Sequence, residues 1–182
     1  MDKGIKATKR IKAGSTVSAS FSFDSAALAK KLLAAAPERA REVLIRRFGL
    51  GGNPERETLE SIGDRTSITR ERVRQIEVAG LDAVRASKAF KDAAGAFDEI
   101  ARYIHSLGAI VPEEMLLSAL GSDEKSRNRF RFFLMVNSAF FRERETDDFL
   151  ARWHVDHAPA PLIHDALSKL DGALADDEVV AE

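Results

Sequence analysis

The stretch TSITRERVRQIEVAG, residues 66–80, brings together three arginines, two glutamates and one glutamine. Arginine presents a planar fork of donors, glutamine both donates and accepts, and glutamate accepts hydrogen bonds. These groups complement the edges of guanine, adenine and cytosine in the major groove of duplex DNA. The stretch therefore suits the reading of DNA bases, provided that one structural element holds these side chains on one exposed face.

Helical periodicity predicts that this element is a helix that begins at Thr69. One side of this helix, at about 100° per residue, carries Val73, Ile76, Gly80, Ala83 and Val84. The opposite side carries Glu71, Arg74, Gln75 and Val78, flanked by Arg70. We expect Val73 and Ile76 to be buried between this helix and the one before it. An ordinary solvated face with weak ion pairs has the same charge pattern, so the charge pattern alone favours a solvated face over DNA reading.

Three helices are predicted before this one. The first begins near Ser25 and continues through Leu28, Leu32 and Leu33 to Ala36. A helix that follows Pro37 ends at the glycines of residues 49–52, and Thr58 caps a short helix with Leu59 and Ile62 facing inward. A short helix, a tight turn and a longer helix with a polar outer face form the layout of a helix-turn-helix.

Three segments, REVLIRRFGL (41–50), TLESIG (58–63) and ITRERVRQIE (68–77), resemble region 4 of the primary-type bacterial sigma factors in their order and spacing. The resemblance extends over about residues 27–85 and implies two contacts. The recognition helix would enter the major groove of the promoter upstream element, with Arg70, Glu71, Arg74 and Gln75 facing the bases and Thr69 and Arg72 facing the backbone. A concave apolar face would dock on the flap of the RNA polymerase β subunit through Val43, Leu44, Phe48 and Leu50.

The sequence departs from the sigma pattern in two ways. Two positions that are usually basic in the family are Ala79 and Asp82 here, and the loss of phosphate contacts weakens DNA binding. The region that holds the core enzyme and melts the start site in that family has no counterpart in this sequence. The resemblance therefore implies a transcription regulator that binds promoter-type DNA and core RNA polymerase without starting transcription alone. The alternative is a polymerase-binding accessory protein, similar to the delta subunit, whose helix-turn-helix mainly docks on protein.

The second half is predicted to form a winged helix. Helices are expected over residues 97–107, after Pro112 and from Ser122, and residues 139–155 alternate as a β-hairpin, with strand expected only there. This order of elements is similar to HARE-HTH domains and to the folded part of the RNA polymerase delta subunit. The expected fold is mainly α: a four-helix, helix-turn-helix domain similar to sigma region 4, followed by a winged-helix domain with one β-hairpin.

Charge separates the same two halves. Residues 1–91 carry 19 basic and 11 acidic side chains, whereas residues 92–182 carry 9 and 18. The acidic second half favours a further protein partner over DNA, although Arg127, Arg129 and Arg131 offer a basic strip on its third helix. The expected divisions are a basic arm (1–22), the helix-turn-helix domain (23–90), the winged-helix domain (95–157), and a C-terminal helix with an acidic tail (158–182).

Several classes of function find no support in the sequence. The chain has no cysteine, and His154, His157 and His164 lack a metal-ligand spacing. No Gly-rich phosphate loop follows a predicted strand, and the longest apolar run, residues 132–136, is far shorter than a membrane span. We therefore expect no catalytic residue, cofactor, metal or membrane partner, and a cytoplasmic, nucleoid-associated protein.

Overall fold

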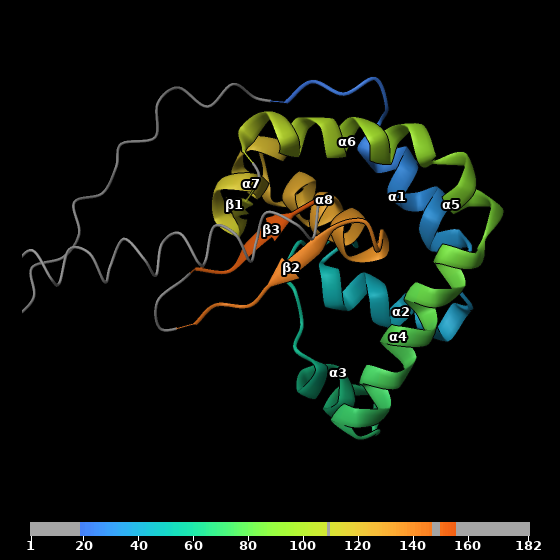
Figure 1. Ribbon diagram of the computed structural model, residues 1–182. Helices are drawn as coiled ribbons and strands as arrows, with labels where there is room; N and C mark the ends of the chain where they lie inside the picture. Colours follow the sequence, from blue (N-terminus) through green and yellow to red (C-terminus); the bar gives the residue numbers. More distant parts are fainter. Residues whose placement is uncertain (1–18, 109, 147–149, 156–182) are drawn as a thin grey trace, which may run out of the picture.

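The computed structural model describes residues 19–108, 110–146 and 150–155. This part of the chain forms eight helices and three short strands, which confirms the expected mainly helical fold (Figure 1). The C-terminal helix and acidic tail, and nearly all of the basic arm, were predicted for residues that lie outside the described part. No helix within the described ranges is both long and apolar enough to cross a membrane.

The first four helices contain the predicted helix-turn-helix. They are α1 (Ser25–Ala34), α2 (Glu38–Phe48), α3 (Leu59–Thr66) and α4 (Arg70–Ala86). Thr58 and Thr69 cap α3 and α4, because their hydroxyls accept hydrogen bonds from the backbone N–H groups of Ser61 (3.1 Å) and Arg72 (3.2 Å). α2 ends at Gly49, whose φ of 62° lies in the left-handed region.

The remaining elements follow the order of a winged helix. They are α5 (Lys88–Asp92), α6 (Ala94–Leu107), β1 (Ile110–Pro112), α7 (Glu113–Leu120), α8 (Glu124–Val136), β2 (Phe141–Glu143) and β3 (Arg152–His154). The strands form one antiparallel sheet in the order β1-β3-β2, with Trp153 of β3 between Val111 and Arg142. The expectation that strand would occur only in the hairpin was wrong, because β1 adds a third strand. Its three residues are too few to show an alternating pattern in the sequence.

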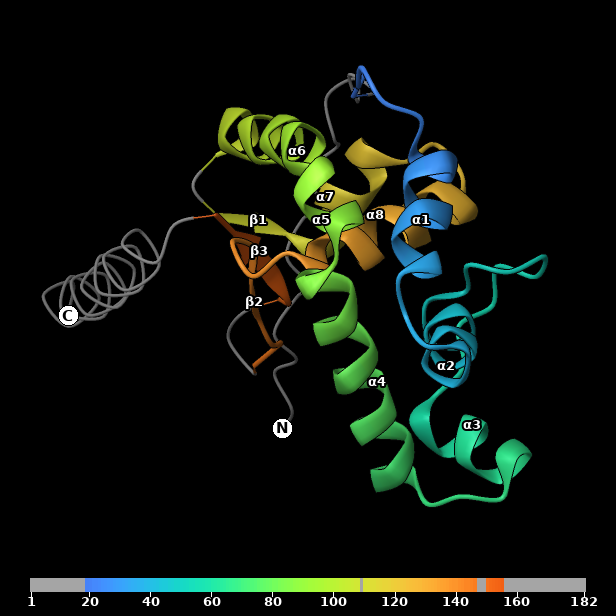
Figure 2. The ribbon, with the colours of Figure 1, turned by 90° about the vertical axis from the view of Figure 1, so that its right-hand side faces the viewer.

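α8 is the central helix of the main core. Its Phe132 and Phe133 are fully buried, and Phe132 packs on Phe48 of α2 with ring centroids 5.5 Å apart. In both views α8 lies inside the molecule, where α7 and the helices of the first half cover it (Figures 1 and 2). One continuous hydrophobic cluster draws on both halves. The domain boundaries are still a prediction, but the segments on either side of residue 90 share this core.

Polar contacts reinforce the junction between the two halves. Arg85, near the end of α4, donates hydrogen bonds to the carbonyls of Met135 (2.8 Å) and Val136 (2.7 Å) at the end of α8. The buried amide of Asn128 donates to the carbonyl of Pro54 at 2.7 Å. Because the last carbonyls of a helix have no partner within it, the Arg85 guanidinium both satisfies α8 and holds α4 against it.

Candidate nucleic-acid interface

A tight turn joins α3 to α4. Ser67 adopts a left-handed conformation with φ of 54°, and the N–H of Ile68 donates to the carbonyl of Gly63 at 3.0 Å. A Cβ added at Gly63 would lie 2.7 Å from the carbonyl oxygen of Ile68, so a glycine is required for this close approach. The turn leaves the first residues of α4 projecting beside α3, away from the main core (Figure 2).

The inner side of α4 follows the predicted stripe with one correction. Val73 and Val84 are fully buried, and Gly80 faces α2, where an added Cβ would lie 2.9 Å from the Cβ of Ala40. Ile76 was expected to be buried but is only half-buried. The small hydrophobic cluster that covers this end of α4 has three buried members, so Ile76 packs at its edge rather than inside it.

The outer side of α4 holds its polar residues in exposed positions. All six predicted DNA-binding residues are exposed at the start of this helix: Thr69, Arg70, Glu71, Arg72, Arg74 and Gln75. Arg74 donates to both carboxylate oxygens of Glu71, at 2.8 and 2.9 Å, and Arg72 donates to the side-chain oxygen of Gln75 at 3.0 Å. Arg70 makes no hydrogen bond or ion pair with any residue of the described ranges.

The charge of this face is fixed at neutral pH. The hydrogen bonds from Arg74 keep the pKa of the Glu71 carboxyl below its ordinary value, and the same contact raises the pKa of Arg74. Exposed ion pairs on one helix contribute little stability, so they open readily when a ligand offers better partners. With three arginines to one glutamate and a helix N-terminus beside them, the face suits an anionic, hydrogen-bonding ligand such as a DNA groove.

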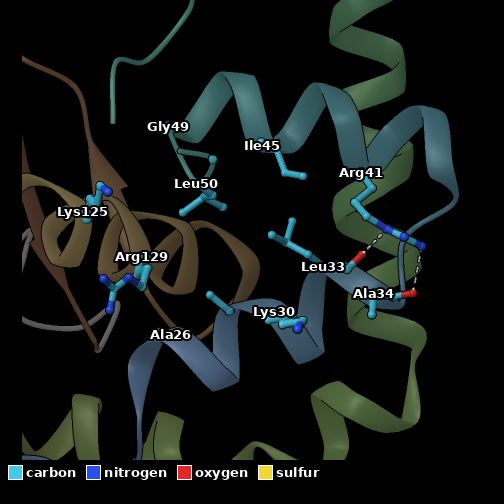
Figure 3. A pocket seen from close by; sticks show the side chains of 12 residues that line it. Ala26, Lys30, Leu33, Ala34, Arg41, Ile45, Gly49, Leu50, Lys125 and Arg129 are labelled. Carbon is cyan, nitrogen blue, oxygen red and sulfur yellow. Dashed lines mark hydrogen bonds between the residues drawn. The ribbon is translucent and has the colours of Figure 1, made fainter. Parts of the chain in front are cut away.

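The four predicted polymerase-binding residues lie deeper than the resemblance implies. Val43, Leu44 and Phe48 are at most 5% exposed, and Leu50 is half-buried. Leu50 lines a hollow of about 510 Å³ between α1, α2 and α8, together with Ile45 (Figure 3). The basic residues around this hollow are Lys30, Arg41, Lys125 and Arg129. The accessible part of the predicted face is therefore Leu50.

The predicted basic strip on α8 is engaged within the protein. Arg127 donates to the carbonyl of Gly121 at 3.1 Å, Arg129 donates to the hydroxyl of Ser25 at 2.9 Å, and Arg131 donates to the side chain of Asn128 at 3.0 Å. In a DNA-reading winged helix, the third helix must be free to enter the major groove. In this structure α8 packs on α1, α2 and α4 instead.

In the sequence, Asp82 stands only as the loss of a phosphate contact. The structure gives it a partner: its carboxylate accepts a hydrogen bond from Arg85 at 2.8 Å, while the same guanidinium binds the end of α8. The spacing of these two residues on one helix was a signal in the sequence. The contact of Arg85 with α8 had no such signal in the sequence, because α8 ends about fifty residues further along the chain.

Comparisons with known proteins bear on the first half. Residues 32–86 match the family model described as Sigma-70, region 4. A stretch of 56 residues is 50% identical to the RNA polymerase sigma factor RpoS of Coxiella burnetii (strain RSA 493 / Nine Mile phase I), and it covers 31% of this chain and 16% of that protein. The match thus spans about one sixth of the relative's length, and no solved structure matches the chain. Residues 32–86, with the α3–turn–α4 motif and its exposed polar face, are therefore similar to sigma-70 region 4.

Proposed function

We propose that this chain is a sigma-like transcription regulator that binds promoter-type duplex DNA with the start of α4 in the major groove. It acts in the cytoplasm, at the nucleoid, and it does not start transcription alone. The observation that carries the proposal is the exposure of all six predicted side chains on the second helix of a helix-turn-helix, within a segment that matches sigma-70 region 4. That family is non-enzymatic, and the proposal assigns no catalysis.

The exposed residues divide into two groups. Glu71, Arg74 and Gln75 present acceptors and donors to base edges once their mutual hydrogen bonds open. Arg70 interacts with Glu71 through its charge, and it joins them with no hydrogen bond to break among the described residues. Thr69 and Arg72 lie at the beginning of α4, where the free N–H groups of the first turn favour a phosphate.

The second part of the proposal concerns RNA polymerase. The hollow between α1, α2 and α8 combines an apolar lining with a basic rim, and Leu50 is its accessible member of the predicted docking face. We propose that this hollow receives the flap of the polymerase β subunit through Leu50, while the buried Val43, Leu44 and Phe48 do not line the hollow and hold α2 in its place. Because α8 is covered, the winged-helix half does not read DNA through that helix, and its acidic surface is left for a further protein partner.

The hollow also favours a second candidate function, in which the chain is a polymerase-binding accessory protein and its helix-turn-helix mainly docks on protein. The two functions differ in what the outer face of α4 contributes. Promoter reading needs a preference for particular base pairs that depends on Glu71 and Gln75. Docking alone predicts no such preference and a strong dependence on Leu50.

The test is selection of binding sites from a randomised duplex library by the full chain, with and without core RNA polymerase. Glu71→Ala and Gln75→Ala should each relax the preference at one or two positions, by about 1–3 kcal/mol for each good base contact. Glu114→Ala is the matched control, because Glu114 is an exposed glutamate on α7 that makes no contact with the DNA-binding face. Leu50→Asp should weaken binding to core polymerase and leave the base preference unchanged.

Two results separate the alternatives. A base preference that Glu71→Ala and Gln75→Ala leave intact, or DNA binding without any preference, contradicts promoter reading. Loss of polymerase binding in Leu50→Asp, together with DNA binding without preference, supports the accessory function instead. Wild-type binding of Leu50→Asp to core polymerase refutes the docking role of the hollow in both cases.

A further inference from the structure

A second charged site lies where the wing meets the helix-turn-helix half. It is a cleft of about 330 Å³ bounded by α2, the loop before α3, α4, the start of α7, α8, strand β2 with the residue after it, and strand β3. Five arginines line it: Arg47, Arg56, Arg131, Arg142 and Arg144. The lining contains two carboxylates, Glu77 and Glu113, so positive charge exceeds negative charge by three. None of these residues belongs to the DNA-binding face of α4.

Both carboxylates are already engaged. Glu113 accepts hydrogen bonds from Arg142 and from the indole N–H of Trp153 (3.1 Å), and it lies 3.6 Å from Arg131. Although burial acts in the opposite direction, these contacts hold the pKa of the Glu113 carboxyl below its ordinary value. Glu77, whose pKa is raised by burial, lies 3.3 Å from Arg47. Neither carboxylate is left to neutralise the other arginines.

Several donors in the cleft are left without an acceptor. Arg56 and Arg144 are exposed at its mouth and make no hydrogen bond or ion pair with residues in the described ranges. The Nε atoms of Arg47 and Arg131 are buried, and each meets one of the two carboxylates, at 3.3 Å from Glu77 and 3.6 Å from Glu113. Burial and then the nearby charge of Arg56 lower the pKa of Arg131.

We propose that this cleft binds a phosphate group. Arginine forks match phosphate oxygens in geometry and charge, and charge-assisted hydrogen bonds of this kind are roughly twice as strong as neutral ones. Donors from α2, the loop before α3, α8 and β2 converge on one concave space, and a doubly charged phosphate offsets most of the excess charge. The phosphate group belongs either to a small free phosphate compound or to the backbone of duplex DNA. The site does not depend on promoter reading by α4.

The protein contains a natural probe of this cleft. Trp153 is the single tryptophan of the chain, is 1% exposed, and donates its indole N–H to Glu113 in the cleft wall. Tryptophan fluorescence of the full chain therefore reports a change at Glu113. The probes are inorganic phosphate, inorganic pyrophosphate and a duplex DNA, each titrated at constant ionic strength against a chloride blank.

The wild-type protein should show a saturable change of emission. Arg56→Ala and Arg144→Ala should each weaken the response by about ten-fold or more, because each removes one charged fork from the phosphate. Both side chains are exposed and unpaired, so their removal should leave the thermal midpoint unchanged. Arg102→Ala is the matched control, because Arg102 is an exposed arginine on α6 outside the cleft.

The three titrations identify the source of the phosphate group. Saturation by phosphate or pyrophosphate assigns the cleft to a free phosphate compound. Saturation by the duplex alone assigns it to the DNA backbone, and Arg144→Ala should then lower the slope of log affinity against log salt by about one for every sequence. The proposal is overturned if none of the three probes changes the emission, if Arg102→Ala weakens the response as much as Arg144→Ala, or if a polyglutamate peptide alone elicits the response.

Discussion

The small cluster between α3 and α4 should hold the DNA-binding face in place. Ile62 of α3 is 0% exposed and packs with Val43 of α2 and Val73 of α4. This cluster is separate from the main core, and α3 packs mainly beside α4 and α2. The perturbation is Ile62→Ala, which opens a cavity at the centre of the cluster while leaving every exposed polar residue of α4 unchanged.

The magnitude follows from the burial of this side chain. The deleted methyl and methylene groups contribute roughly 2.4 kcal/mol, at about 0.8 kcal/mol for each buried group. A residual cavity adds to that loss, and Ile→Ala changes in packed cores cost about 2–5 kcal/mol in total. We expect about 3 kcal/mol. Because local openings cost less than global unfolding, the effect should be concentrated in α3 and the first turns of α4.

The assay is native-state hydrogen exchange of the full chain. Amides of α3 and of the start of α4 should lose protection by about a hundred-fold, since 1.4 kcal/mol corresponds to a factor of ten. Amides of α8 should keep theirs. Ile62→Val is the control, with an expected cost of about 0.5–1.5 kcal/mol. An equal loss of protection in α8 would refute the idea of a separate cluster, and unchanged protection in α3 would show that the cluster does not hold the motif.

Two further predictions concern α4. Gly80→Ala should lower the thermal midpoint, because the added Cβ would lie 2.9 Å from the Cβ of Ala40 and overpacking costs about 1–3 kcal/mol. Gly95→Ala, in the open first turn of α6, should raise the thermal midpoint slightly, and a rise in both variants would contradict the close packing at Gly80. Arg85→Ala should lower the free energy of unfolding, measured in urea, by about 2–3 kcal/mol, because it removes two charge-assisted hydrogen bonds to carbonyls. Asp82→Ala should lower it by less than about 1 kcal/mol, and equal losses in the two variants would contradict the role of Arg85.

Local signals predicted the motif well. The threonine caps of α3 and α4, the glycine that ends α2 and the exposure of six polar residues at the start of α4 are all present. Each depends on residues within a few positions of one another, where capping and helical periodicity act. The same reasoning gave the order of helices and the hairpin in the second half.

The features that escaped prediction depend on distant packing. Ile76 shares the side of Val73 on a helical projection, but its burial depends on how far the small cluster extends over α4. Strand β1 has three residues and exists because β3 pairs with it. The arginine cleft draws on residues that are far apart in the sequence, from α2 to β3, although Arg142 in β2 and Arg144 just after it were a visible hint of a basic face.

One departure of α4 from the sigma pattern, Asp82, has a structural cause in the second half of the chain. The family usually has a basic residue at position 82, and its replacement by Asp82 first suggested that DNA reading had decayed. In the structure Asp82 orients Arg85, and Arg85 binds the last carbonyls of α8. A lysine or arginine at position 82 would repel Arg85 from that contact. Asp82 is therefore explained by the packing of α4 on α8, and it carries no weight against DNA binding by the exposed residues at the other end of the same helix.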